Sequence, residues 1–275
     1  MAAVTYRSVT SIEGWLAATD YEIFKEVLAC QQRQGVEGAI AEVGVHHGKS
    51  FVPLAAFSGT SKLYAIDLFG DQGKNIDQSG NGDRDTFVNN LKRFLIDLSR
   101  LVIDRRMSGN VTADDIRSAA GPVRFFHIDG GHHFDAVTGD IRLAVDVLAD
   151  GGVIAIDDVF RPEWPEVSIA TFCSKEFVAK DIVLFAIGFN KAYFSRRAHA
   201  EAYQEALVRS RFLAAHLNRI YRPKDDKILV FQQYPLPEWG VRRIVYWLMS
   251  VYAPYRYVAF RTGLAKLKKL LGRSS

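Results

Sequence analysis

Apolar residues follow two alternating patterns along this chain, and together they predict a sheet interleaved with helices. Short apolar runs at 39–45, 62–66 and 123–128 are typical of buried strands. Between such runs, apolar residues recur at helical spacing, as in 23–28 and 87–95. Because strands that alternate with helices pair in parallel, we expect an α/β fold with a Rossmann-like, doubly wound and mostly parallel sheet.

The last part of this pattern predicts how the sheet ends. The segment 181–195, DIVLFAIGFNKAYFS, contains two apolar runs separated by residues 188–190, which favours an antiparallel hairpin. A long helix over about 199–218 and a short strand at 227–231 follow it. We therefore expect seven strands with an antiparallel C-terminal hairpin, and helical additions at both ends of the chain.

Pattern and charge divide the chain into three parts. Residues 1–38 are expected to form a helical segment, 39–235 carry the alternating pattern of the main domain, and 236–275 form a basic amphipathic tail. From residue 237 onward there are eight Lys or Arg side chains and one acidic side chain, whereas the whole chain has a net charge of +4. A mildly acidic body therefore carries a strongly basic end.

The sequence of the basic tail is compatible with more than one binding partner. Apolar residues at 260, 264, 267 and 271 follow helical spacing and have Lys and Arg around them. Such a helix suits an anionic membrane surface. The alternative is a helix docked on its own domain or on a second subunit of a homo-oligomer. We expect no nucleic-acid partner, because no recognised binding motif accompanies the charge.

Composition limits the class of protein. With 275 residues, of which 48% are hydrophobic and 24% charged, the chain has material for one large core. Cys30 and Cys173 lie far apart without a metal-ligand spacing, so we expect a reducing compartment and no disulfide framework. The N-terminus lacks a secretory pattern, and no apolar run is long enough for a membrane span. The expected location is the cytoplasm, peripheral at the membrane if the tail binds lipid.

A glycine turn follows the first predicted strand, and the second strand ends in an acid. The turn has the pattern Glu42-x-Gly44-x-x-x-Gly48-x-Ser50, and Asp67 ends the second strand. Glycines let a backbone approach a ligand closely, and an acid at this position can accept hydrogen bonds from ribose hydroxyls. The pattern predicts a nucleotide-type cofactor site, but it lacks both the G-x-G-x-x-G fingerprint of dinucleotide sites and the P-loop.

These two stretches, E-V-G-V-H-H-G-K-S and A-I-D-L-F, resemble the first two motifs of class I S-adenosylmethionine-dependent methyltransferases. The resemblance implies that S-adenosyl-L-methionine is the cofactor. It also implies that Gly44 and Gly48 shape the loop around the methionine portion, with Glu42 nearby, and that Asp67 holds the ribose.

Two central strands end in acid. Asp129 follows the strand at 123–128, and Asp157 and Asp158 follow the strand that ends at 156. In a βαβ unit these strands are parallel neighbours, so the three carboxylates meet at the carboxyl edge of the sheet, where such folds bind ligands. A hard divalent cation would relieve their repulsion. The alternative is that each acid only caps a helix or closes a turn.

The centre of the chain resembles the metal-dependent O-methyltransferases that modify sugar hydroxyls in macrolide biosynthesis, and related glycan or natural-product methyltransferases. The matching pieces are Asp129-x-x-His132, Asp140, Gly151-Gly152, Asp157-Asp158 and Trp164-Pro165. By this resemblance, Asp129, Asp157 and Asp158 include the ligands of Mg²⁺ or a similar divalent cation, and His132 is the general base. Asp140 can equally belong to a solvated helix face.

The prediction from the sequence is therefore an S-adenosylmethionine-dependent, Mg²⁺-assisted O-methyltransferase. Its acceptor is a hydroxyl of a sugar, a glycolipid or a related natural product. One alternative is a nicotinamide oxidoreductase on a similar sheet, which the absent dinucleotide fingerprint weakens. Another is a non-catalytic membrane-surface protein on a degenerate methyltransferase fold.

Overall fold

The structure is a computed structural model that describes residues 4–71, 73, 80–223 and 226–232. The chain divides into two units, 1–234 and 235–275, and all described residues belong to the first. The predicted basic tail at 236–275 therefore lies outside the described residues. Across the described ranges, no helix combines the length and the apolar composition that crossing a bilayer would need.

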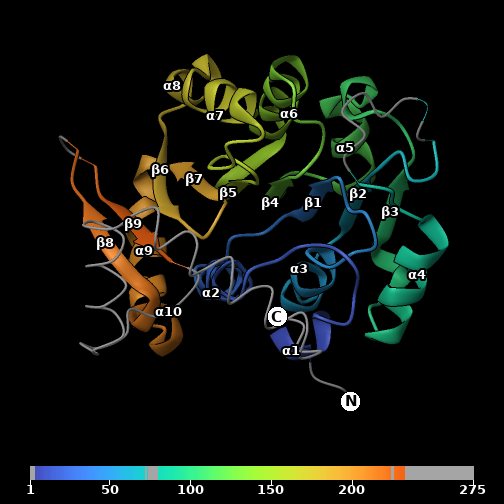
Figure 1. The fold of residues 1–275 in the computed structure, drawn as a ribbon, viewed down its shortest axis with the longest axis horizontal. Helices are drawn as coiled ribbons and strands as arrows, with labels where there is room; N and C mark the ends of the chain where they lie inside the picture. The colour runs from blue at the N-terminus through green and yellow to red at the C-terminus, as the bar shows by residue number, and fades with distance from the viewer. Residues whose placement is uncertain (1–3, 72, 74–79, 224–225, 233–275) are drawn as a thin grey trace, which may run out of the picture. The chain divides into compact units, whose positions relative to one another are not determined.

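A sheet of nine strands runs through the described residues in the order β3-β2-β1-β4-β5-β7-β6-β9-β8. Its strands are β1 (Ala39–Val43), β2 (Leu63–Ile66), β3 (Leu101–Asp104), β4 (Val123–Ile128), β5 (Leu148–Ile156), β6 (Ile182–Ile187), β7 (Ala192–Arg196), β8 (Leu217–Tyr221) and β9 (Ile228–Phe231). Strands β1 to β5 pair in parallel, and β7 lies antiparallel between β5 and β6 (Figure 1). The predicted mostly parallel sheet with its antiparallel hairpin is confirmed.

The described sheet is wider than the seven strands that the sequence predicts, because it also contains β8 and β9, and β9 is the short strand expected at 227–231. Strand β9 pairs in parallel with β6, and β8 pairs antiparallel with β9. The helix expected over about 199–218 is two helices, α9 (Arg197–Arg209) and α10 (Arg211–His216). Ser210 separates them in extended backbone and caps α10 with its side chain. The chain after α10 is then extended and joins the sheet as β8.

Helices cover both faces of the sheet (Figure 1). One face carries α1–α4, α9 and α10, and the other carries α5–α8. The remaining bounds are α1 (Tyr6–Val9), α2 (Ala18–Arg33), α3 (Phe51–Phe57), α4 (Arg84–Arg93), α5 (Ala113–Ala120), α6 (Phe134–Val147), α7 (Pro165–Phe172) and α8 (Lys175–Ala179), with short 3-10 turns η2 (Leu98–Arg100) and η3 (Ser108–Asn110). Within β4, Phe125 packs into one core and Phe126 into the other. Burial on both faces explains why the central strands are continuous apolar runs.

The first strand and its glycine turn lie directly against the end of β4. Gly44 has φ +80°, and a Cβ at this position would lie 1.8 Å from the carbonyl oxygen of Asp129. Only glycine fits this contact, because any side chain would collide with backbone that is itself held in the sheet. The turn therefore brings the loop after β1 and the acid after β4 together at the carboxyl edge.

Candidate active site

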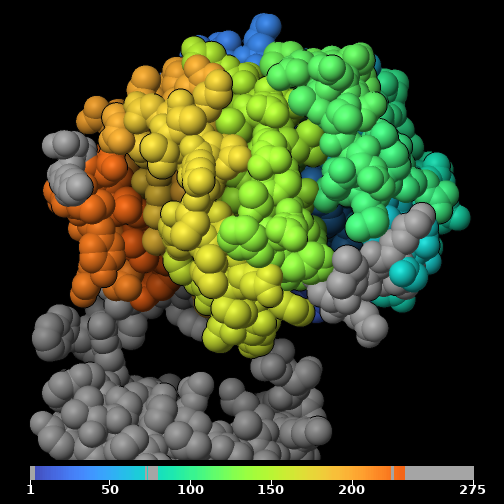
Figure 2. All heavy atoms as spheres, turned by 90° about the horizontal axis from the view of Figure 1, so that it is seen from above, coloured from blue at the N-terminus to red at the C-terminus, as the bar shows by residue number. Residues whose placement is uncertain are grey.

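A cavity of about 700 Å³ lies at the carboxyl edge of the sheet. Its lining includes Gly44, Asp67, His132 and Asp158, which come from the ends of β1, β2, β4 and β5, together with Lys191 from the β6–β7 hairpin. The space-filling view shows a hollow between green and yellow-green segments, with blue atoms of the N-terminal part at its bottom (Figure 2). Small-molecule sites typically occupy roughly 300–1,000 Å³. The cavity therefore has the size of a cofactor or substrate site.

Two of the residues predicted to bind the cofactor, Gly44 and Asp67, line this cavity. The carboxylate of Asp67 accepts hydrogen bonds from the backbone N–H groups of His46, at 2.7 Å, and Phe69, at 2.6 Å. Asp67 therefore ties the glycine loop to the end of β2. Each carboxylate oxygen has a second lone pair, so Asp67 can also accept a hydrogen bond from a ligand hydroxyl.

The other two predicted cofactor residues, Gly48 and Glu42, are not among the residues that line the cavity. A Cβ on Gly48, which has φ +89°, would lie 2.9 Å from the ring of Phe87, so glycine here lets the loop pack on α4. Glu42 is completely buried, accepts a hydrogen bond from Ser50 and lies 3.4 Å from Nδ1 of His127. Burial raises the pKa of Glu42 to about 8, although the hydrogen bond from Ser50 opposes this. Contact of either residue with the cofactor stays a prediction.

The three acids expected at one edge do meet at the cavity. The register of β4 and β5 pairs Ile128 with Ile156, so the residues that follow these strands lie side by side. The backbone N–H of Asp157 donates to the carbonyl of Ile128 at 2.9 Å and continues this ladder by one bond. Asp129, Asp157 and Asp158 all line the cavity.

His132, the predicted general base, is held by Asp158. Its Nε2 lies 3.0 Å from Oδ2 of Asp158, and its ring stacks on Trp164 with centroids 4.4 Å apart. Burial alone would raise the pKa of Asp158, but hydrogen bonds from His132 and Asn190 outweigh burial and hold it below its usual value. An ionised carboxylate only accepts hydrogen bonds, so Nε2 carries the proton and the basic lone pair lies on Nδ1.

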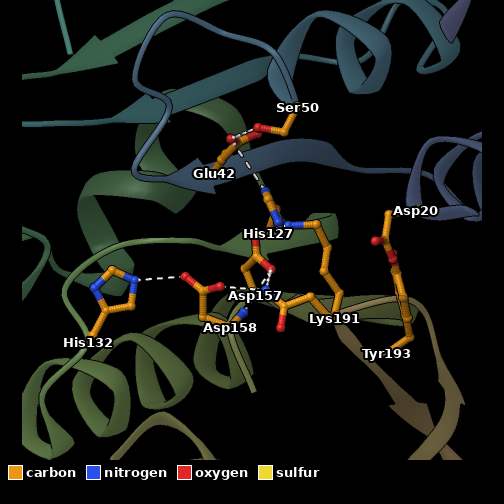
Figure 3. A network of polar contacts seen from close by, with 10 residues as sticks. Asp20, Glu42, Ser50, His127, His132, Asp157, Asp158, Lys191 and Tyr193 are labelled. Atoms are coloured by element: carbon orange, nitrogen blue, oxygen red, sulfur yellow. Dashed lines mark hydrogen bonds and ion pairs between the residues drawn. The ribbon is translucent and has the colours of Figure 1, made fainter. Parts of the chain in front are cut away.

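The positive charge among these acids belongs to Lys191, which the sequence analysis did not single out. Lys191 lies just before β7, is only 2% exposed and donates to Oδ2 of Asp157. Its neighbour Asn190 donates through Nδ2 to Asp157, at 3.1 Å, and to Asp158. Figure 3 shows Lys191, Asp157 and Asp158 converging. The available signal was a lysine directly before an apolar strand, because a buried lysine nearly always has a charged partner.

Asp20 completes the surroundings of this ammonium from the side of α2. Asp20 is 1% exposed and its Oδ1 accepts a hydrogen bond from the hydroxyl of Tyr193 at 2.6 Å. Burial raises the pKa of Asp20 to about 7, although Lys191 and Tyr193 oppose this. Burial would lower the pKa of Lys191, but Asp157, Asp129 and Asp20 together raise it above its usual value. Lys191 is therefore charged, and it faces carboxyl groups from three elements.

The predicted magnesium ligands do not fit that ion as they stand. Lys191 already donates to Asp157, and burial, followed by the nearby Asp157, raises the pKa of Asp129 well above its usual value, which opposes the ionised form that a metal ligand needs. A divalent ion about 4 Å from an ammonium would be repelled by roughly 8 kcal/mol at an effective dielectric constant of about 20. Magnesium at Asp129, Asp157 and Asp158 stays a prediction that requires Lys191 to move.

A different trio has the spacing of metal ligands. One donor atom each of Glu42, His127 and Asp129 lies within 4.8 Å of the others. His127 is completely buried, and within the described residues neither ring nitrogen has a hydrogen-bond partner. Burial, followed by Lys191, holds the pKa of His127 well below its usual value. Because Lys191 acts on all three groups, the same repulsion applies to a cation here.

Asp140 does not lie on a solvated face of α6. It is 1% exposed, and its Oδ2 lies against the backbone of Gly130 next to the cavity. Burial raises the pKa of Asp140 to about 7, although a hydrogen bond with Ser108 opposes this. The sequence pattern did not predict its burial, because the helix positions on either side of it contain both polar and apolar residues.

Comparison with known families decides the class of this site. Residues 41–159 match a family model described as a methyltransferase domain. The matched range begins in β1 and ends just after Asp158, so it contains the glycine loop, Asp67 and all three acids. Residues 41–159 therefore form a methyltransferase domain.

This fold is also similar to that of solved structures. It superposes on the O-methyltransferase NovP with a TM-score of 0.55 and 12% identity, covering 65% of this chain and 80% of NovP. The calicheamicin methyltransferase CalS11 has a TM-score of 0.48 and 16% identity over 68% of this chain and 77% of its own. The O-methyltransferase TomG from Streptomyces achromogenes has a TM-score of 0.43 and 17% identity, over 65% of this chain and 80% of TomG. At such identity the NovP match shows the fold alone, and no curated protein sequence matches this methyltransferase as a relative.

Proposed function

We propose that this methyltransferase transfers the methyl group of S-adenosyl-L-methionine to a hydroxyl of a sugar, a glycolipid or a related natural product. One observation carries the proposal. A single cavity is lined both by the predicted cofactor residues Gly44 and Asp67 and by the hydrogen-bonded pair His132 and Asp158. A sulfonium methyl is already activated, so the enzyme chiefly has to align an oxygen behind it and remove the proton of that oxygen.

In this proposal the cofactor lies over the glycine turn. Gly44 lines the cavity at this turn, and Asp67 accepts hydrogen bonds from the ribose hydroxyls. Its two contacts with the backbone of His46 and Phe69 fix the carboxylate before the cofactor arrives. A fixed acceptor loses little side-chain entropy on binding, which favours affinity.

His132 serves as the general base. Asp158 holds Nε2–H, so Nδ1 takes the proton of the acceptor hydroxyl, and the ionised Asp158 then stabilises the imidazolium that forms. Assistance by a general base typically contributes roughly 10² to 10⁴ in rate. Stacking on Trp164 restricts the imidazole to one plane, which helps to aim the base.

Aromatic and polar side chains at the same cavity support a sugar-like acceptor. Trp164 and Trp15 line it together with Arg161 and Asn190. A sugar ring offers C–H faces for aromatic contact and hydroxyls for hydrogen bonds, and indole rings supply large apolar area. NovP, whose structure this fold resembles, is named an O-methyltransferase, which agrees with transfer to oxygen.

The sequence also predicts that Mg²⁺ assists the transfer. The structure gives this prediction less support, because Lys191 and Asn190 already donate hydrogen bonds to Asp157 and Asp158. Chelation tests it directly. Turnover that stops with a chelator and returns with Mg²⁺ would support a metal, and turnover that continues would argue against one.

The proposed function is tested in two steps. Calorimetry should show binding of S-adenosylhomocysteine by the wild type, with clear loss of affinity in Asp67→Ala. Mass spectrometry should then detect methylated product when S-adenosyl-L-methionine is offered with a panel of sugar nucleotides and glycolipids.

His132→Ala should lower methyl transfer by roughly 10² to 10⁴ without weakening S-adenosylhomocysteine binding. The matched control is His199→Ala, a histidine on α9 that does not line the cavity and should leave transfer unchanged. Wild-type protein that binds no S-adenosylhomocysteine, or transfer that is insensitive to His132→Ala, would refute the proposal.

A further inference from the structure

The acids of the candidate site surround a cation that the chain itself supplies. Lys191 reaches them from the tip of the β6–β7 hairpin and is only 2% exposed (Figure 3). Its Nζ donates to Oδ2 of Asp157, while Asp129 and Asp20 also act on its charge. A buried ammonium is retained in a fold only where such carboxyl groups compensate it.

The carboxylate oxygens of Asp157 and Asp158 also face protein donors. Oδ1 of Asp157 accepts from Asn190 Nδ2 at 3.1 Å and from the backbone N–H of Asp158 at 2.8 Å. For Asp158, Oδ1 accepts from Asn190 and Oδ2 from His132 at 3.0 Å. All four oxygens of the pair therefore accept hydrogen bonds within the protein. Magnesium demands several oxygen ligands in near-octahedral geometry, and these donors lie where it would approach.

We propose that Lys191 is the resident cation of this site, a tethered ammonium that takes the position among Asp129, Asp157 and Asp158 that a divalent metal ion occupies in metal-dependent O-methyltransferases. The proposal rests on the proposed function, since it assigns how that site balances its charge. It implies that the acceptor hydroxyl is held and deprotonated without a bound metal.

Lys191 acts through other residues and is therefore a positioning residue. It fixes Asp157, Asn190 links Asp157 to Asp158, and Asp158 holds His132. This chain of contacts connects the ammonium to the general base. Loss of the ammonium should leave uncompensated carboxyl groups in a site of the right size for a cation, which creates affinity for a metal ion.

The test measures metal binding and needs no acceptor. Mn²⁺ is the probe, because it prefers the same oxygen ligands as Mg²⁺ and its spin resonance signal reports the free ion. Wild-type protein should show no saturable Mn²⁺ site at the edge of the sheet. Lys191→Met, which keeps the length of the side chain and removes the charge, should bind one Mn²⁺ per chain, and added Mn²⁺ should raise its melting temperature.

Three further variants control the result. Lys191→Arg keeps the positive charge and should remain without a Mn²⁺ site. Lys175→Met removes an exposed lysine of α8 and should behave as the wild type. Adding Asp157→Asn to Lys191→Met should abolish the Mn²⁺ site that the single variant gains.

A wild-type protein that binds one Mn²⁺ and loses it in Asp157→Asn would overturn the proposal. So would a Lys191→Met protein that is folded by circular dichroism and gains no Mn²⁺ affinity. If Lys191→Met does not fold, the Mn²⁺ titration of the wild type still tests the proposal. A saturable Mn²⁺ site that depends on Asp157 would refute a resident ammonium. The absence of such a site would support it. None of these readouts involves cofactor or methyl transfer, so failure here is distinct from failure of the proposed function.

Discussion

Replacing Asp140 with asparagine should make the free energy of unfolding less sensitive to pH. Asp140 lies on α6 with 1% of its surface exposed, and within the described residues its Oδ2 has no hydrogen-bond partner. Burial raises the pKa of this carboxyl from 3.8 to about 7 against the opposing effect of Ser108. The amide of asparagine has nearly the same shape and does not titrate in this range.

The sign and size follow from proton linkage. Between pH 4 and pH 7 the folded protein keeps the proton of Asp140 while the unfolded chain releases it, so stability is full below pH 4 and falls as pH rises towards 7. One pKa unit corresponds to about 1.4 kcal/mol. A change from 3.8 to about 7 therefore removes about 4 kcal/mol of stability over this range. Asp140→Asn should escape that loss.

Chemical unfolding at pH 5, 6, 7 and 8 measures the effect. The free energy of unfolding of Asp140→Asn should increase relative to that of the wild type as pH rises. A destabilising effect of the amide that does not depend on pH cancels when this difference is compared between pH values. Asp146→Asn, an exposed position on the same helix, is the matched control and should show no such trend. An Asp140→Asn difference that is equal at pH 5 and pH 8 would refute the reasoning.

Four other outcomes are expected. Gly44→Ala should unfold the protein or destabilise it by several kcal/mol in a thermal melt, because its Cβ would lie 1.8 Å from the carbonyl oxygen of Asp129. Gly139→Ala, on α6, should instead raise stability by about 0.5–1 kcal/mol, because the added Cβ would point into open space. Asp158→Asn should lower methyl transfer by roughly 10²-fold or more, with unchanged affinity for S-adenosylhomocysteine, because the imidazole of His132 loses its ionised partner. A variant that transfers methyl groups as fast as the wild type would exclude this role of Asp158. A chain truncated before Pro237 should float less with anionic liposomes than the full chain, and equal flotation would remove the membrane as partner of the tail.

Local patterns were sufficient to predict the sheet and the acids at its edge. Strands buried on both faces, such as β4 with Phe125 and Phe126 in opposite cores, appear in the sequence as unbroken apolar runs. An acid directly after such a run must lie at the carboxyl edge of the sheet. Asp67, Asp129 and Asp157 could therefore be placed without any knowledge of packing.

The partners of these acids could not be predicted in the same way. Lys191 is 34 residues from Asp157 in the sequence. The two side chains meet only because β7 inserts between β5 and β6. Tyr193 and Asp20, 173 residues apart, meet through the packing of α2 on the sheet. Contacts between distant segments depend on strand order and helix docking, for which local periodicity has no signal. The break at Ser210 was missed for a related reason, since the end of a helix depends on a single cap.

The hairpin that delivers Lys191 has a consequence for the order in which the molecule matures. A ribosome releases β4 and β5, with their acids, well before it releases the hairpin. Until β7 docks, the nascent sheet has no internal ammonium at this edge, so its carboxyl groups must stay hydrated or hold protons. Docking of the hairpin then brings the ammonium of Lys191 against the carboxylate of Asp157. Closure of the sheet should therefore coincide with completion of the site.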